Sequence, residues 1–303
     1  MKPTSPSDLL ASNAAPASLV MRLLPAIGWT RAFVARRRRI MLALATIMFI
    51  AGLAWSLDAA NIGLGGIAWH WLLGAVVLGF GGVFLNGIEL SASSAAIGRR
   101  FPASEAIHLS SVGILSNLLP VPASAIVRGG ALVAKGATIA ESGTILLYVG
   151  LLRLAVAGMF TGAALHSGSL GLPIIAASAL ASAVLVAMIA RIGGIPAAIA
   201  LFALRAGMLA IVAAQLLLCF WALGANATIL DAALHSIAPV VGSAVGIVPG
   251  GLGVSEAIGA GLAVLAATSP AMAFAALALT RLAGYACAFV TVMGFQLREL
   301  VAR

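Results

Sequence analysis

The sequence predicts an all-α integral membrane protein with six full transmembrane helices and two re-entrant helical hairpins arranged as an inverted repeat. Three observations predict this fold. Hydrophobic residues make up 62% of the 303 residues and charged residues 8%, against roughly 25% charged in a soluble domain. Two apolar stretches are broken by proline or glycine and carry a charge just past the break. Lysine and arginine gather at alternate ends of the apolar runs.

The chain begins with a polar segment that differs from the rest. Residues 1–39 are rich in serine, proline and alanine and end in Arg36–Arg39. We expect a disordered basic cytoplasmic tail there, followed by a polytopic transmembrane domain over residues 40–303. The net charge is +9. Because the basic residues lie at the ends of apolar runs and not in one patch, anionic lipid is the expected contact and nucleic acid is not.

Six uninterrupted apolar runs are long enough to cross a bilayer as helices. Polar turns or basic residues separate them, and Trp69 and Trp71 suit the membrane interface. Arg205 stands at the start of the fifth run and is expected on the cytoplasmic side. The predicted spans are Ile40–Leu57, Trp69–Leu90, Thr144–Leu165, Pro173–Ala190, Ala206–Leu223 and Ala271–Gln296.

The first broken stretch predicts two half-length helices. Glu105–Leu118 is a short amphipathic run that contains Asn117. Pro120 and Pro122 then remove two backbone donors and end the helix. Ala123–Val133 resumes it and carries Ser124 and Arg128. Two half-helices around a break are typical of a hairpin that leaves the membrane on the side it entered.

The second broken stretch repeats this pattern. Ala232–Val248 is apolar, and Pro249, Gly250, Gly251 and Gly253 interrupt it. Val254–Ala267 resumes the helix with Glu256 in its first turn. A glycine-rich break leaves backbone N–H groups accessible at a helix N-terminus, which favours anions. Glu256 is an alternative partner for that helix dipole.

The distribution of charge supports the hairpin interpretation. If the N-terminus is cytoplasmic and only the six full spans cross, every Lys and Arg outside the membrane segments from residue 36 onward falls on the cytoplasmic side. The two hairpins then enter from opposite faces, as in an inverted repeat. The protein is expected in a bacterial-type inner membrane as a multi-pass protein, with both termini on the cytoplasmic side.

Four charges are expected at membrane depth: Arg128, Arg153, Arg281 and Glu256. Three interpretations are open. The charges form a structural ion-pair network, or they line a water-filled or proton-coupled pathway, or they bind an anion such as a lipid phosphate. Asn117 and Ser124 are candidate donors to a head group or caps of the half-helices. Glu89 is expected at head-group level and solvated.

Catalytic and metal-binding patterns are not predicted. Cys219 and Cys287 fall within apolar runs, and His108 and His235 lack metal-ligand spacing. We find no nucleophile motif or phosphate-binding loop. The sequence therefore predicts neither an enzyme nor a cofactor.

The order of these motifs resembles a known family. Over about residues 40–297 the sequence resembles the transmembrane region of lysylphosphatidylglycerol synthase/flippase proteins and their stand-alone flippase-like relatives. The resemblance lies in the run from Asn117 to Pro120, then Arg128, Arg153 and the Pro249–Glu256 motif. Family members commonly carry Gly-Glu just before the arginine, where this sequence has Ser124-Ala125. The resemblance implies lipid translocation. No synthase domain follows in this sequence, so lipid synthesis is not expected.

The leading hypothesis is a lipid flippase or lipid-binding transporter for an anionic or amphipathic lipid. Arg128, Arg153 and Arg281 would hold the head group between the hairpins. The alternative is a non-transporting membrane scaffold for a lipid-modifying enzyme, and an integral-membrane enzyme is the third hypothesis. The expected partner is a phospholipid or isoprenoid lipid. Two protein partners are compatible with the sequence: a second copy of the chain, which would form a homodimer, and a lipid-synthesis enzyme.

Overall fold

The computed structural model describes residues 43–118, 123–244, 251–266 and 268–301. Within these ranges the protein is helical and contains no strand. The predicted tail over residues 1–39 and three of the predicted site residues, Pro120, Pro249 and Gly250, lie outside the described residues. Four helices are long and apolar enough to cross a membrane: α3 (Trp69–Ala96), α6 (Ile139–Ala164), α7 (Gly171–Ala222) and α11 (Pro270–Val301).

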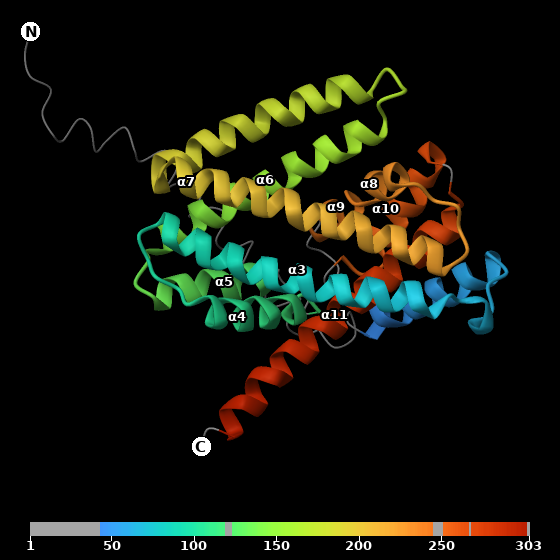
Figure 1. Ribbon diagram of the computed structural model, residues 1–303, viewed down its shortest axis with the longest axis horizontal. Helices are drawn as coiled ribbons and strands as arrows, with labels where there is room; N and C mark the ends of the chain where they lie inside the picture. Colours follow the sequence, from blue (N-terminus) through green and yellow to red (C-terminus); the bar gives the residue numbers. More distant parts are fainter. Residues whose placement is uncertain (1–42, 119–122, 245–250, 267, 302–303) are drawn as a thin grey trace, which may run out of the picture.

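Shorter helices complete the described part of the chain (Figure 1). An apolar helix over Ala43–Ala59 corresponds to the first predicted span, Ile40–Leu57. The remaining short elements are η1 (Leu64–Gly66), α4 (Ala103–Ser116), α5 (Ala123–Ala134), α8 (Ile229–His235), α9 (Ala238–Ala244), α10 (Val254–Leu262) and η3 (Ala263–Leu265).

Helix α7 contains two of the predicted spans, Pro173–Ala190 and Ala206–Leu223. Gly194 has a non-helical backbone with φ 83°, which glycine adopts without a Cβ clash. Pro196 follows, in the first turn of the second arm, where its missing N–H removes no helical hydrogen bond. Figure 1 shows the chain folding back at this end, so residues 171–193 and 195–222 form two arms.

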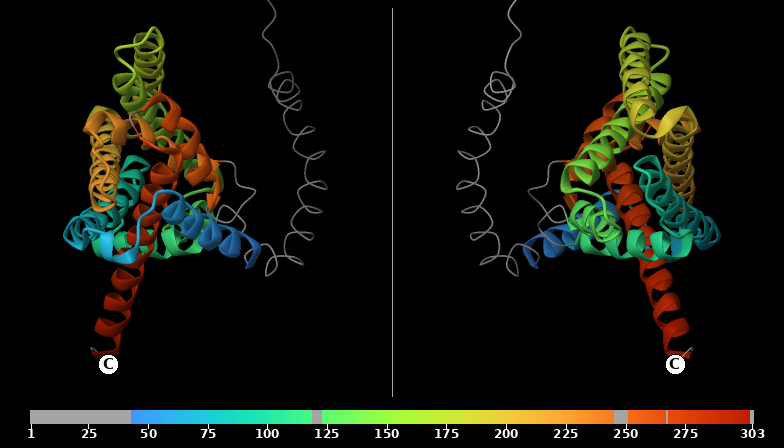
Figure 2. Two further views of the ribbon diagram at one scale, coloured as in Figure 1. Left: turned by 90° about the vertical axis from the view of Figure 1, so that its right-hand side faces the viewer. Right: turned by 90° about the vertical axis from the view of Figure 1, so that its left-hand side faces the viewer.

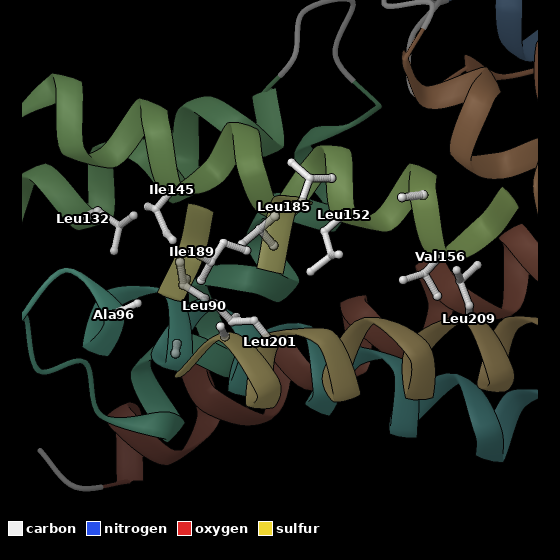
Figure 3. Packing of buried hydrophobic residues seen from close by; sticks show 14 of the residues in the cluster. Leu90, Ala96, Leu132, Ile145, Leu152, Val156, Leu185, Ile189, Leu201 and Leu209 are labelled. Atoms are coloured by element: carbon white, nitrogen blue, oxygen red, sulfur yellow. The ribbon is translucent and has the colours of Figure 1, made fainter. Parts of the chain in front are cut away.

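A large apolar cluster lies where α3 and α6 pack along α7. Leu90, Leu152, Ile189 and Leu201 are among its fully buried side chains (Figure 3). The outer faces of the same helices are also apolar, and large side chains such as Leu73, Leu147 and Leu180 remain exposed. Exposed apolar surface over this many helices is typical of a protein surrounded by lipid.

The first broken stretch folds as a hairpin of α4 and α5. Its two ends lie together, because the Lys135 ammonium group is 2.8 Å from a Glu105 carboxylate oxygen and 5.1 Å from the Phe101 ring centroid. Phe101 and Lys135 line a common surface cavity with Ala95 at the C-terminal end of α3. This hairpin therefore opens at that end of α3.

The second broken stretch also folds back on itself. Ala227, just before α8, and Ala263, just after α10, share a buried cluster with Ala75 near the N-terminal end of α3. In Figure 1 the α4–α5 hairpin and the group α8–α10 accordingly lie toward opposite ends of α3. Helix α11 contacts both α4 and α10, and Figure 2 shows it projecting beyond the bundle. We refer to α4–α5 as the first hairpin and α8–α10 as the second.

The first arm of the second hairpin differs from the predicted single run Ala232–Val248. It begins at Thr228, whose hydroxyl accepts a hydrogen bond from the Asp231 N–H in a reciprocal cap. It is then divided into α8 and α9 after His235. Pro239 lies in the first turn of α9 and has no N–H for the His235 carbonyl, which explains the division.

Candidate functional site: a cationic cavity between the hairpins

A cavity of about 240 Å³ lies where the two hairpins approach each other. The first hairpin contributes Asn117 at the end of α4. The second contributes Ser243 from α9 and Ser255 and Glu256 from α10. The other polar lining residues come from the long helices and are Asn86 of α3, Arg153 of α6, Gln215 of α7, and Thr280, Arg281 and Tyr285 of α11.

A smaller cavity of about 80 Å³ adjoins the first. The two share Gly82, Asn86, Arg153 and Val212 among their lining residues. Arg205 lines only the smaller one. Arg153 therefore stands at the junction of the two spaces.

Glu89 of α3 is 0% exposed, so the expectation of a solvated head-group residue is wrong. Its carboxylate forms ion pairs with Arg128 of α5 and with Arg205 of α7, the latter at 2.7 Å. A buried carboxylate is costly without partners, and two arginines supply them. Arg128 is therefore engaged by Glu89 and does not line the cavity in which it was expected to hold an anion.

The partner of Arg128 bears on the family resemblance. The acidic residue that the related pattern places just before the arginine is absent at Ser124-Ala125. In the fold, Glu89 supplies a carboxylate to Arg128 from a different helix. The carboxylate that pairs with Arg128 therefore comes from a residue 39 positions away in sequence.

Arg205 is only 4% exposed and lies ten residues into the second arm of α7, so its predicted place at the start of a span is wrong. In the sequence the predicted run Ala206–Leu223 directly follows an arginine, whereas the helical arm begins after Gly194 and contains Arg205. A sequence signal was present, since the apolar residues Pro196–Leu204 continue the run upstream of the arginine.

Glu256 is fully buried and has two partners. One carboxylate oxygen is 3.0 Å from Arg281 Nε of α11, and the other accepts a 2.8 Å hydrogen bond from the Gly253 N–H. Gly253 has φ 80°, a left-handed conformation that permits the sharp turn into α10. Glu256 therefore caps its own helix and also pairs with Arg281.

Arg153 contrasts with the other arginines of this region. It is half-buried, and none of the ion pairs formed by the described residues includes it. Glu89 and Arg128 lie close enough to interact with it electrostatically. A guanidinium without a carboxylate partner in a low-dielectric surrounding attracts anions.

The predicted site residues are thus brought together in part. Asn117, Arg153, Glu256 and Arg281 line one cavity although they come from four helices. Arg128, Ser124, Gly251 and Gly253 lie outside its lining.

Sequence reasoning did not identify Gln215 or Tyr285 as site residues, because single polar residues on apolar helices carry no motif. The hydroxyl of Ser255, also missed, is buried and has no hydrogen-bond partner among the described residues.

Comparisons with protein-family models, with curated proteins and with solved structures each find no match to this chain. The resemblance in sequence pattern to the flippase-like family therefore remains a prediction. What the protein does has to be inferred from its fold and from the cavity.

Proposed function

We propose that this protein is a lipid flippase or lipid-binding transporter that moves an anionic or amphipathic lipid across the cytoplasmic membrane. The observation that carries the proposal is a polar cavity with an excess of arginine, placed inside a bundle whose outer surface is apolar. A lipid has the same two parts, a charged head group and apolar chains. The cavity offers donors to the first, and the surrounding bilayer accommodates the second.

The proposal includes a membrane topology with six full spans and two re-entrant hairpins. Each hairpin begins and ends at the same end of the bundle, and the two hairpins open at opposite ends of α3. In a bilayer this arrangement lets each hairpin reach inward from its own face without crossing. Both termini would then be cytoplasmic, as the positions of lysine and arginine favour.

Corresponding contacts in the two halves support an inverted repeat. The first hairpin packs through α4 on α11, and the second packs through α8 on α6. In the first hairpin Gly113 lies against Ser124 at the start of α5, and in the second Gly242 lies against Ser255 at the start of α10. Arg153 of α6 and Arg281 of α11 line the cavity from the two halves. Such repeats place a binding site near the middle of the membrane and give alternating access when one half moves against the other.

Reconstitution tests the proposal directly. We expect liposomes with the purified chain to translocate fluorescent anionic phospholipid faster than empty liposomes. Arg153→Gln should abolish most of the increase, because it removes the cavity arginine that forms no ion pair with a described residue. Arg191→Gln is the matched control, since Arg191 is exposed near the bend of α7. Translocation no faster than in empty liposomes, across phospholipid and polyprenyl-phosphate probes, would overturn the proposal and favour the scaffold alternative.

Cysteine labelling tests the topology. Both native cysteines are buried, so labelling by a maleimide reports on the engineered cysteines. Arg100→Cys and Lys135→Cys flank the first hairpin. Re-entry predicts that a membrane-impermeant maleimide labels both from the same side in oriented vesicles. Labelling from opposite sides contradicts the hairpin topology.

A further inference from the structure

We infer that the cavity binds a lipid whose head group is a phosphate monoester, a group that carries two negative charges. This inference rests on the proposed function and specifies its substrate class. It is carried by the charges of the side chains in and around the cavity and by the cavity's size.

The charge balance of the region leaves two positive charges. Arg128 and Arg205 share the single carboxylate of Glu89, which leaves one. Arg153 has no ion pair among the described residues, which adds the second. Arg281 and Glu256 balance each other.

No other charged residue in the part of the chain that the structure describes lines either cavity. The segments 119–122 and 245–250, which join the arms of the hairpins, contain no charged residue in the sequence. Asp231 caps α8 beside Thr228, and Glu105 pairs with Lys135 at the open end of the first hairpin. Asp231, Glu105 and Lys135 line neither the larger nor the smaller cavity.

A buried excess of two positive charges is unfavourable unless an anion compensates it. A phosphate monoester supplies two negative charges, a phosphodiester supplies one, and a zwitterionic head group supplies none in net terms. The monoester is therefore the head group that brings the cavity closest to neutrality.

The donors in the cavity fit three terminal phosphate oxygens. Arg153 presents a planar guanidinium that can donate two parallel hydrogen bonds. Ser255 adds a buried hydroxyl that has no partner among the described residues. Asn86 and Gln215 are less suited, because their amide groups already donate to the carbonyls of Gly82 and Ala75.

The volume favours a compact head group. About 240 Å³ is below the range of roughly 300–1,000 Å³ common for sites that enclose a drug-sized ligand. A phosphate fits this space. The apolar chains of the lipid would remain among the exposed apolar side chains of the bundle.

A matched pair of lipids tests the inference. Phosphatidic acid and phosphatidylmethanol with identical labelled chains differ by one methyl group and one negative charge. At about pH 8 the monoester, with a second pKa near 6, is doubly charged. We expect the purified full chain in phosphatidylcholine nanodiscs to bind phosphatidic acid at least about tenfold more tightly, as one charged hydrogen bond would give. Arg153→Gln should remove most of this preference, and Arg191→Gln should leave it intact.

Each other outcome has a defined meaning. Equal binding of the two lipids, together with translocation of either, overturns the monoester assignment and leaves the proposed function in place. Absence of both binding and translocation overturns both. Competition by glycerol 3-phosphate or inorganic phosphate at the same concentration as phosphatidic acid identifies a soluble phosphate ligand and overturns the assignment to a lipid.

Discussion

The two hairpins are attached to the bundle by buried ion pairs of opposite polarity. In the first hairpin the arginine belongs to the hairpin, as Arg128, and the acid belongs to the bundle, as Glu89. In the second the acid belongs to the hairpin, as Glu256, and the arginine belongs to the bundle, as Arg281. A charge pair with either order of the charges can therefore hold a broken helix inside an apolar bundle.

The difference lies in what else each acid does. Glu89 also holds Arg205, so it is shared between two arginines, and it does not line the larger cavity. Glu256 also caps α10 through the Gly253 N–H and lines that cavity. The first pair leaves a surplus arginine in the bundle, and the second is neutral and lies where a ligand would bind.

Removing the shared acid should have the largest effect. Glu89→Gln leaves two buried arginines without their carboxylate, which costs about 3–5 kcal/mol for a broken buried pair. We expect a large drop in the temperature of half-unfolding in detergent, measured by circular dichroism. Glu299→Gln, at an exposed position on α11, is the control. Equal melting of the two variants would show that Glu89 is not a structural counter-ion.

The second largest effect on stability should come from the glycines at which the two arms of each hairpin pack together. A Cβ at Gly242 would come 2.9 Å from both the Cα and the N of Ser255, whereas a Cβ at Gly113 would be 3.7 Å from the Cα of Ser124. Gly242→Ala should destabilise by about 1–3 kcal/mol because backbone cannot move aside easily, and Gly113→Ala by less than about 1 kcal/mol. Thermal melts of both variants measure this, and a larger loss for Gly113→Ala contradicts the contact geometry.

The arginines should separate into structural and ligand-binding groups. Arg128→Gln removes one partner of Glu89 and should cost about 1–3 kcal/mol, as for a lost hydrogen bond to a buried charge. Arg153→Gln breaks no ion pair among the described residues and should leave the melting temperature unchanged or raised while abolishing translocation. The melting temperatures and initial translocation rates are compared for both variants. If Arg153→Gln lowers the melting temperature and Arg128→Gln does not, Arg153 is the structural arginine and the two roles are exchanged.

The exposed pair at the open end of the first hairpin should matter least. Glu105 and Lys135 are in contact but accessible, with 42% and 34% of their side chains exposed. Glu105→Gln should change stability by at most about 1 kcal/mol, because water screens such pairs. A melt at low and at high salt measures the contribution. A loss as large as that of Glu89→Gln would show that this end of the hairpin is less solvated than its exposure indicates.

The sequence by itself determined the helical membrane class, the positions of the long apolar helices and the two breaks. These follow from composition, apolar run length and the backbone chemistry of proline and glycine, all of which are local properties. The sequence also indicated that Arg153, Glu256 and Arg281 belong together, because isolated charges in apolar runs require polar surroundings.

Only the tertiary structure decided which charges meet. Glu89 and Arg128 are 39 residues apart, and Glu89 and Arg205 are still further apart, so no local pattern could pair them. The fold-back of α7 at Gly194 brings Arg205 alongside α3. This pairing occupies Arg128 and leaves Arg153 at the cavity without a carboxylate among the described residues. The physical reason is that ion pairing depends on distance in space, and packing between helices sets that distance.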